Sequence, residues 1–207
     1  MPLPTHSTRQ PTACAATAST TSFTPRCTCS FGRLFFWAVD PRRFSRLLLL
    51  DVDLHVRTNL DTLLAYPLKW AIGAVACADN ENYFNTGVVL LRPNLKTFRT
   101  LLMVHPGKKC ENKVTDQSVL NVLFYRWDRL RLPYNVPNGL HARAPEPFWQ
   151  HAAIGVLHFT SEPKPWEHPD TLKRAFHRSP RSMQNVERYR TACGLGSILS
   201  TVSGPGG

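Results

Sequence analysis

The sequence predicts an α/β domain in which a mixed sheet is flanked by helices, and three features carry that prediction. Four consecutive leucines at residues 47–50 are typical of a buried strand and lead directly into Asp51 and Asp53. Strand-type and helix-type segments then alternate along the chain. A hydrophobic content of 43% is enough for a core in a chain of 207 residues. We therefore expect one ordinary domain with tails.

Strands are expected where apolar residues run together or alternate, at residues 47–50, 70–78, 86–92, 127–135 and 154–159. Helices are expected where apolar residues recur at helical spacing or follow a capping residue, at residues 31–37, at 58–64, and after Asn94 and Thr115. The last two helices should point apolar side chains inward, namely Leu95, Phe98, Leu101 and Leu102 on the first and Val119, Leu120, Leu123 and Phe124 on the second. Residues 137–147, with proline and glycine, should form a loop.

The two ends differ in composition from the middle. Residues 1–30 hold twelve Ser or Thr, four Pro and no Asp or Glu, so we expect a disordered segment. The same composition describes an organellar transit peptide, or an incorrectly assembled start of the protein. The predicted domain occupies residues 31–170, and residues 171–207 should be a basic C-terminal tail, with a surface helix and disorder.

Charge and cysteine content narrow the classes of partner. The chain has 25 Lys+Arg against 14 Asp+Glu, a formal charge of +11, which favours anionic partners such as nucleotides, phosphates, acidic glycans, nucleic acid or an anionic membrane surface. Its six cysteines include no Cys-x-x-Cys pair and are expected to be ordinary thiols. No stretch approaches the roughly 18 apolar residues that span a bilayer, so we expect a soluble chain.

Asp51 and Asp53 form a candidate divalent-cation site. Alternate side chains of an extended strand point to the same face, so the two carboxylates should converge on one ion. Hard oxygen ligands favour Mg²⁺ or Mn²⁺ over zinc. His55 shares that face and is a competing ligand. Acidic residues after a strand also serve as caps and turn formers, which is the structural alternative.

Seven short blocks, in order and at near-family spacing over residues 31–168, resemble the glycogenin-like glycosyltransferases of family 8. They are Arg33-Leu34-x-x-Trp37, Leu50-Asp51-Val52-Asp53, Asn59-Leu60-Asp61, Phe84-Asn85-Thr86-Gly87-Val88, Asp116-Gln117-x-x-Leu120-Asn121, Leu132-Pro133-Tyr134-Asn135 and His158-Phe159-x-x-x-Pro163-Lys164-Pro165-Trp166. The resemblance implies a GT-A (nucleotide-diphospho-sugar transferase) fold with a Rossmann-like sheet. The implied activity moves a hexosyl group from a UDP-sugar to an acceptor with retention of configuration, using Mn²⁺ or Mg²⁺.

The resemblance also implies roles for individual residues. Asp51, Asp53 and His158 would be the metal ligands, and His55 would be structural. Asp116 and Gln117 would be catalytic, with Asp116 as a nucleophile or as a stabiliser of an oxocarbenium-like state, so that double displacement and front-face attack both stay open. The implied substrate-binding residues are Arg33, Asp51, Val52, Asp53, Asn85, Gly87, Asp116, Gln117, Ser161 and Lys164.

The chain departs from the family pattern in three places. The family begins with strands and a helix that hold uracil and ribose, whereas only 32 residues precede Arg33, and their composition does not suit that task. We therefore expect the nucleotide-binding portion to be missing. Arg33 stands where lysine is common, and Ser161 stands where glycine often lets the backbone approach phosphate.

Two rival functions follow from these observations. A non-catalytic, truncated relic of the fold would act as a binding or structural protein. A nucleic-acid binder would explain the charge, but the sequence has no clustered basic helix, stacking motif or finger, so we expect no specific nucleic-acid partner. The acceptor stays open between a glycan, a protein and a small molecule, and a homodimer is a further expectation. The resemblance implies the cytoplasm or the Golgi lumen.

Overall fold

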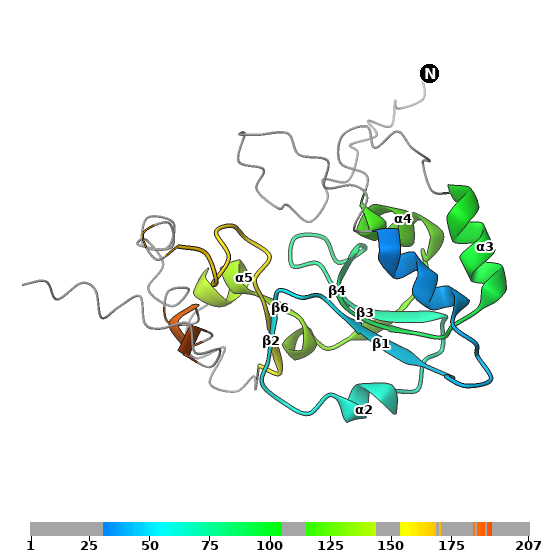
Figure 1. Cartoon of the computed structure of the whole chain (residues 1–207), viewed down its shortest axis with the longest axis horizontal. Helices are drawn as coiled ribbons and strands as arrows, with labels where there is room; N and C mark the ends of the chain where they lie inside the picture. The colour runs from blue at the N-terminus through cyan, green and yellow to red at the C-terminus, as the bar shows by residue number, and fades with distance from the viewer. Residues whose placement is uncertain are drawn as a thin grey trace, which may run out of the picture.

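The computed structural model describes residues 31–104, 115–143 and 154–168, together with positions 170, 184, 186–188, 190 and 191. Within these ranges the chain forms two sheets flanked by helices (Figure 1). The predicted α/β class is confirmed, although the strands divide between two sheets. The predictions for residues 1–30, and for most of 171–207, lie outside the described residues.

The larger sheet has four strands in the order β1-β4-β3-β5. Its strands are β1 (Leu47–Leu50), β4 (Phe84–Leu91), β3 (Ile72–Ala76) and β5 (Asp128–Leu130). β4 runs antiparallel to both β1 and β3, and β5 runs parallel to β3. Leu50, the last residue of β1, pairs with Val88. Asp51 therefore leaves the sheet beside Gly87.

The smaller sheet places residues from distant parts of the chain side by side. It has the order β2-β7-β6, with β2 (Leu54–Val56), β7 (Val156–His158) and β6 (Val136–Pro137). β2 and β7 are antiparallel, and Leu54 pairs with His158. The sequence predicted β7 but neither β2 nor β6. Because β2 starts directly after Asp53, this pairing brings Asp53 next to His158.

Helices cover both faces of the larger sheet. The 3₁₀ helix η1 (Phe31–Ala38) lies with α3 (Leu95–Val104) and α4 (Asp116–Leu123) on one side, and α2 (Asp61–Leu64) lies on the other (Figure 1). α5 (Asn138–Arg143) occupies part of the stretch predicted as a loop, and a short 3₁₀ turn η2 (Leu132–Tyr134) interrupts the predicted strand at 127–135.

The two predicted capping residues start their helices. Asn94 Oδ1 accepts a hydrogen bond from Thr97 N at 3.0 Å. Thr115 and Ser118 form a reciprocal capping box at the start of α4. The inward face predicted for α4 is confirmed, since Val119, Leu120, Leu123 and Phe124 all belong to the core cluster. The face predicted for α3 is wrong at Leu95 and Leu102, which are half exposed, because only the stripe with Leu101 and Phe98 reaches the core.

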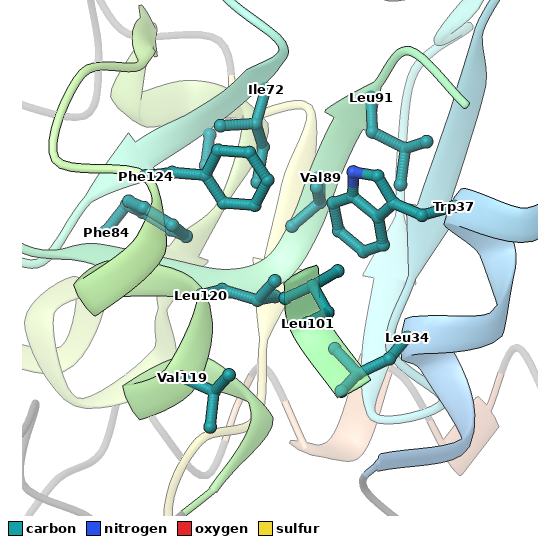
Figure 2. Packing of buried hydrophobic residues seen from close by; sticks show 11 residues of the cluster. Leu34, Trp37, Ile72, Phe84, Val89, Leu91, Leu101, Val119, Leu120 and Phe124 are labelled. Atoms are coloured by element: carbon teal, nitrogen blue, oxygen red, sulfur yellow. The ribbon is translucent and has the colours of Figure 1, made fainter. Parts of the chain in front are cut away.

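Alternate side chains of β4 point to opposite faces of the sheet and pack into two separate apolar clusters. Val89 and Leu91 face a cluster formed with η1, α3 and α4, in which Trp37 is enclosed by apolar side chains (Figure 2). Val88 and Leu90 face the opposite cluster, which includes Val156 of the smaller sheet. The strand that carries Gly87 is thus fixed from both faces.

Replacing Trp37 by alanine is expected to lower the free energy of unfolding by about 3–5 kcal/mol, because Trp37 is fully buried and stacks on Phe124 with ring centroids 5.8 Å apart. The matched control is Phe36→Ala on the same helix, where the ring is 44% exposed and the expected loss is below about 1 kcal/mol. Urea denaturation of both variants measures the difference, and equal losses would contradict this description of the core.

Two further findings concern the cysteines and the length of the helices. Cys77 is disulfide-bonded, so the expectation of ordinary thiols is wrong for this residue. Within the described residues, no helix combines the length and the apolar character needed to cross a membrane.

Candidate metal and donor site

The two aspartates converge through a turn between the sheets rather than along a strand. β1 ends at Leu50, and residues 52 and 53 form a turn before β2 begins. Asp51 N donates to Gly87 O at 2.9 Å, and Phe159 N donates to Asp53 O at 2.9 Å. The backbone of each aspartate is therefore tied to a different sheet. The expectation that the residues share one strand face is wrong, although their convergence is observed.

His158 completes a group of three potential metal ligands. Its Nε2 lies 3.3 Å from Asp53 Oδ1 and 3.8 Å from Asp51 Oδ2. One ligand atom from each of the three residues lies within 4.8 Å of the others. Among the described residues, no other group of three such side chains meets this test. Two carboxylates with one imidazole suit Mn²⁺ or Mg²⁺, so this donor set fits a divalent cation.

Gly87 gives His158 the space it needs. A Cβ atom added to Gly87 would collide with the imidazole ring of His158, at both Cε1 and Nδ1, and would also press on Asn85 Oδ1. Any side chain here would displace the ring. The position of the His158 ring therefore requires glycine at residue 87, and a contact between Gly87 and a substrate stays a prediction.

Arg33 joins four parts of the site through one guanidinium. Its Nη1 donates to Thr86 O at 2.9 Å, its Nη2 contacts Asp51 Oδ1, and its Nε lies 3.1 Å from Asp116 Oδ2. These bonds connect η1 to the end of β1, to β4 and to the start of α4. The guanidinium also compensates two carboxylates at once.

Lys164 supplies the second fixed cation. Its Nζ donates to Asp53 Oδ2 at 2.9 Å and to Phe159 O at 2.6 Å, from a loop that contains a cis Glu162–Pro163 peptide bond. Arg190 Nη1 braces the same loop by donating to Pro165 O at 2.9 Å. Burial alone would raise the pKa of Asp53, but the hydrogen bonds and charges of His158 and Lys164 outweigh it and hold that pKa below its usual range. Asp53 is thus ionised at neutral pH.

The sequence of this chain is similar to those of known glycosyltransferases. A family model described as glycosyl transferase family 8 matches residues 27–169. The chain belongs to glycosyl transferase family 8. It is 29% identical to a glycogenin of Neurospora crassa over 141 residues, which cover 66% of this chain and 20% of that protein. It is 32% identical to UDP-glucuronate:xylan alpha-glucuronosyltransferase 1 of Arabidopsis thaliana over 87 residues, 42% of this chain and 12% of that protein.

A solved structure supports the same assignment. The glycosyltransferase GlyE of Streptococcus pneumoniae matches with a TM-score of 0.55 and 25% identity, over 67% of this chain and 39% of that one. The fold is that of the GT-A glycosyltransferases, as expected from the sequence. The chain spans only one fifth or less of the two curated relatives above.

The two residues expected to be catalytic in this family 8 chain lie at the start of α4. Asp116 is 6% exposed, and burial raises the pKa of its carboxyl even though Arg33 opposes the shift. Gln117 Oε1 accepts from Thr86 N at 3.0 Å, which ties α4 to β4. Asn121 strengthens this connection through hydrogen bonds to both backbone groups of Phe84. Asp116 and Asp51 therefore both contact the guanidinium of Arg33, and the helix that carries Asp116 is tied to β4.

Other predicted residues lie around the metal group. Asn85 Oδ1 accepts from Gly87 N at 2.8 Å and from Asn135 Nδ2 at 2.7 Å, so it is engaged by the protein itself. Val52 is 94% exposed between the two aspartates. Ser161 is half-buried in the loop before Lys164. The structure gives these residues positions near the site, and their contacts with a substrate stay predictions.

His55 is not part of the metal group. It lies on β2 opposite Leu157, and burial, followed by the charge of Arg57, lowers its pKa. Sequence reasoning assigned no role to Asn135, whose Oδ1 lies 2.9 Å from His158 Nδ1. The only signal for it was its place in the block Leu132-Pro133-Tyr134-Asn135, where a polar residue follows a turn.

Proposed function

We propose that this chain is the metal-binding and catalytic part of a retaining hexosyltransferase that uses a UDP-sugar and Mn²⁺. The observation that carries the proposal is the convergence of Asp51, Asp53 and His158 in a family 8 chain. The name of the Arabidopsis relative, a transferase acting with UDP-glucuronate, supports a UDP-sugar as the donor. The acceptor and the particular sugar are left open.

The charge balance suits a cation that arrives with a diphosphate. The carboxylates of Asp51, Asp53 and Asp116 face two fixed cations, Arg33 and Lys164, and the half-exposed Glu162 adds a carboxylate 3.8 Å from Lys164. Carboxylates therefore outnumber the Arg and Lys side chains at the site, which attracts a divalent cation. Adding that cation offsets the excess negative charge and favours an anionic diphosphate. Metal and nucleotide should therefore bind cooperatively.

Each residue has a task in sugar transfer. Breaking the bond between sugar and diphosphate builds negative charge on the leaving group. A bound Mn²⁺, held by Asp51, Asp53 and His158, would supply Lewis-acid stabilisation of that charge. Lys164 would exchange its bond to Asp53 for a phosphate oxygen and act as a point charge. Asp116 would act at the sugar as a nucleophile or as a stabiliser of positive charge, with Gln117 beside it.

Calorimetric titration of the purified chain with UDP, with and without Mn²⁺, tests this proposal. We expect heat only when the metal is present, and we expect Asp51→Ala to abolish it because the two remaining ligands, Asp53 and His158, cannot hold the ion. Asp79→Ala, which removes an exposed carboxylate from a turn, is the matched control and should titrate like the wild type. Equal heats for wild type and Asp51→Ala, or none in either, would favour the non-catalytic relic.

A further inference from the structure

A series of hydrogen bonds through two side-chain amides leads from the backbone of β4 to the imidazole of His158. Gly87 N donates to Asn85 Oδ1 at 2.8 Å, Asn135 Nδ2 donates to the same oxygen at 2.7 Å, and Asn135 Oδ1 lies 2.9 Å from His158 Nδ1. Asn135 is 2% exposed and His158 is 4% exposed, so water cannot substitute for these partners.

The backbone N–H of Gly87, the first donor in this series, determines which atom donates in every later hydrogen bond. A backbone N–H can only donate, so the Asn85 atom that faces Gly87 must be the amide oxygen. Because that oxygen only accepts, the Asn135 atom facing it must be the NH₂ group. The oxygen of Asn135 is then turned toward His158 and can only accept, so His158 Nδ1 must carry the proton.

We propose that Asn135 is a positioning residue that keeps a proton on His158 Nδ1, so that Nε2, which faces Asp51 and Asp53, is the nitrogen that binds a metal ion. This inference rests on the proposed metal site, because only a metal ligand needs a free lone pair there. Imidazole ligands of metals commonly donate their second N–H to an oxygen, and loss of that oxygen weakens metal binding about 10- to 100-fold. Asn85 orients Asn135 in turn.

The ring has little freedom to escape this arrangement. Turning it over would place ring carbons against Asn135 Oδ1 and leave a buried acceptor without a donor. Gly87 packs against the Nδ1–Cε1 edge of the ring, which limits how far the imidazole can tilt. Packing fixes the plane of the ring, and Asn135 fixes which nitrogen bears the proton.

The proton on Nδ1 can be detected directly by ¹⁵N NMR of histidine ring nitrogens in the metal-free chain. We expect a protonated Nδ1 for His158, assigned by loss of the signals in His158→Ala, whether or not Nε2 also donates to Asp53. An unprotonated Nδ1 in the wild type would overturn the inference without any further variant.

Asn135→Leu is expected to give a mixture of both tautomers and about tenfold weaker Mn²⁺ binding. Asn121→Leu is the structural control, since the Asn121 amide bonds the backbone of Phe84 and Gln117 rather than Asn135 or His158, and this variant should leave the tautomer unchanged. If Asn135→Leu binds Mn²⁺ like the wild type with an unchanged tautomer, Asn135 is not a positioning residue, while the proposed function stands. If the wild type binds no Mn²⁺, the proposed function fails instead.

Discussion

Replacing Gly87 by alanine is expected to weaken Mn²⁺ binding by about 100-fold. The added methyl group would occupy space now filled by the Nδ1–Cε1 edge of His158, and the neighbouring strand is fixed by core residues on both faces. The imidazole must therefore leave its present position relative to Asp51 and Asp53. Displacing a site group by roughly 1 Å costs on the order of 100-fold in function. Mn²⁺ titration followed by electron paramagnetic resonance measures the loss.

Gly73→Ala is the matched control for this variant. Gly73 lies on the adjacent strand β3, and its added Cβ would meet Leu68 Cδ2 at 2.8 Å, which is the end of a flexible side chain. We expect this variant to fold with a modest loss of stability and to bind Mn²⁺ like the wild type. Wild-type Mn²⁺ affinity in Gly87→Ala would show that His158 does not need its present position.

Replacing Lys164 by methionine is expected to weaken UDP binding without weakening Mn²⁺ binding. Binding of UDP in the presence of Mn²⁺ should weaken by roughly 10- to 100-fold, because a hydrogen bond to a charged group contributes about 1.5–3 kcal/mol. Binding of Mn²⁺ alone should be unchanged or tighter, because Asp53 loses the ammonium that now occupies its Oδ2. Calorimetric titrations with each ligand separate the two effects.

Lys96→Met, on the exposed surface of α3, is the control for lost positive charge and should leave both affinities unaltered. A parallel fall in both affinities for Lys164→Met would mean that the loop residue only supports the fold. Unchanged UDP affinity would mean that Lys164 does not reach the phosphates.

Much of this fold could be predicted from local sequence patterns. The apolar stretch of β4 is a strand buried on both faces, as its continuous apolar residues predict. The leucine run of β1 is also a strand, but it lies at the edge of its sheet and is only partly buried, with Leu50 exposed. Asn94 and Thr115 were recognisable as caps because their side chains bond backbone groups three residues ahead. The candidate metal ligands Asp51, Asp53 and His158 were identified through the family resemblance, since no local sequence pattern connects Asp51 with His158.

Features set by long-range contacts could not be predicted. β2 and β6 have three and two residues, and they exist because β7 pairs with both. The turn at Asp51 and Asp53 depends on hydrogen bonds from two different sheets, so strand alternation was the wrong reason for their convergence. The role proposed for Asn135 depends on three successive hydrogen bonds that link Gly87, Asn85, Asn135 and His158. The spacing of these residues in the sequence does not indicate such a connection.

The most direct test of the metal site is an anomalous-scattering map from crystals grown with UDP and Mn²⁺. One peak is expected, with carboxylate oxygens of Asp51 and Asp53 and Nε2 of His158 all roughly 2 to 2.5 Å from it. A peak that excludes His158, or manganese found only elsewhere on the protein, would contradict the site and with it the proposed sugar transfer.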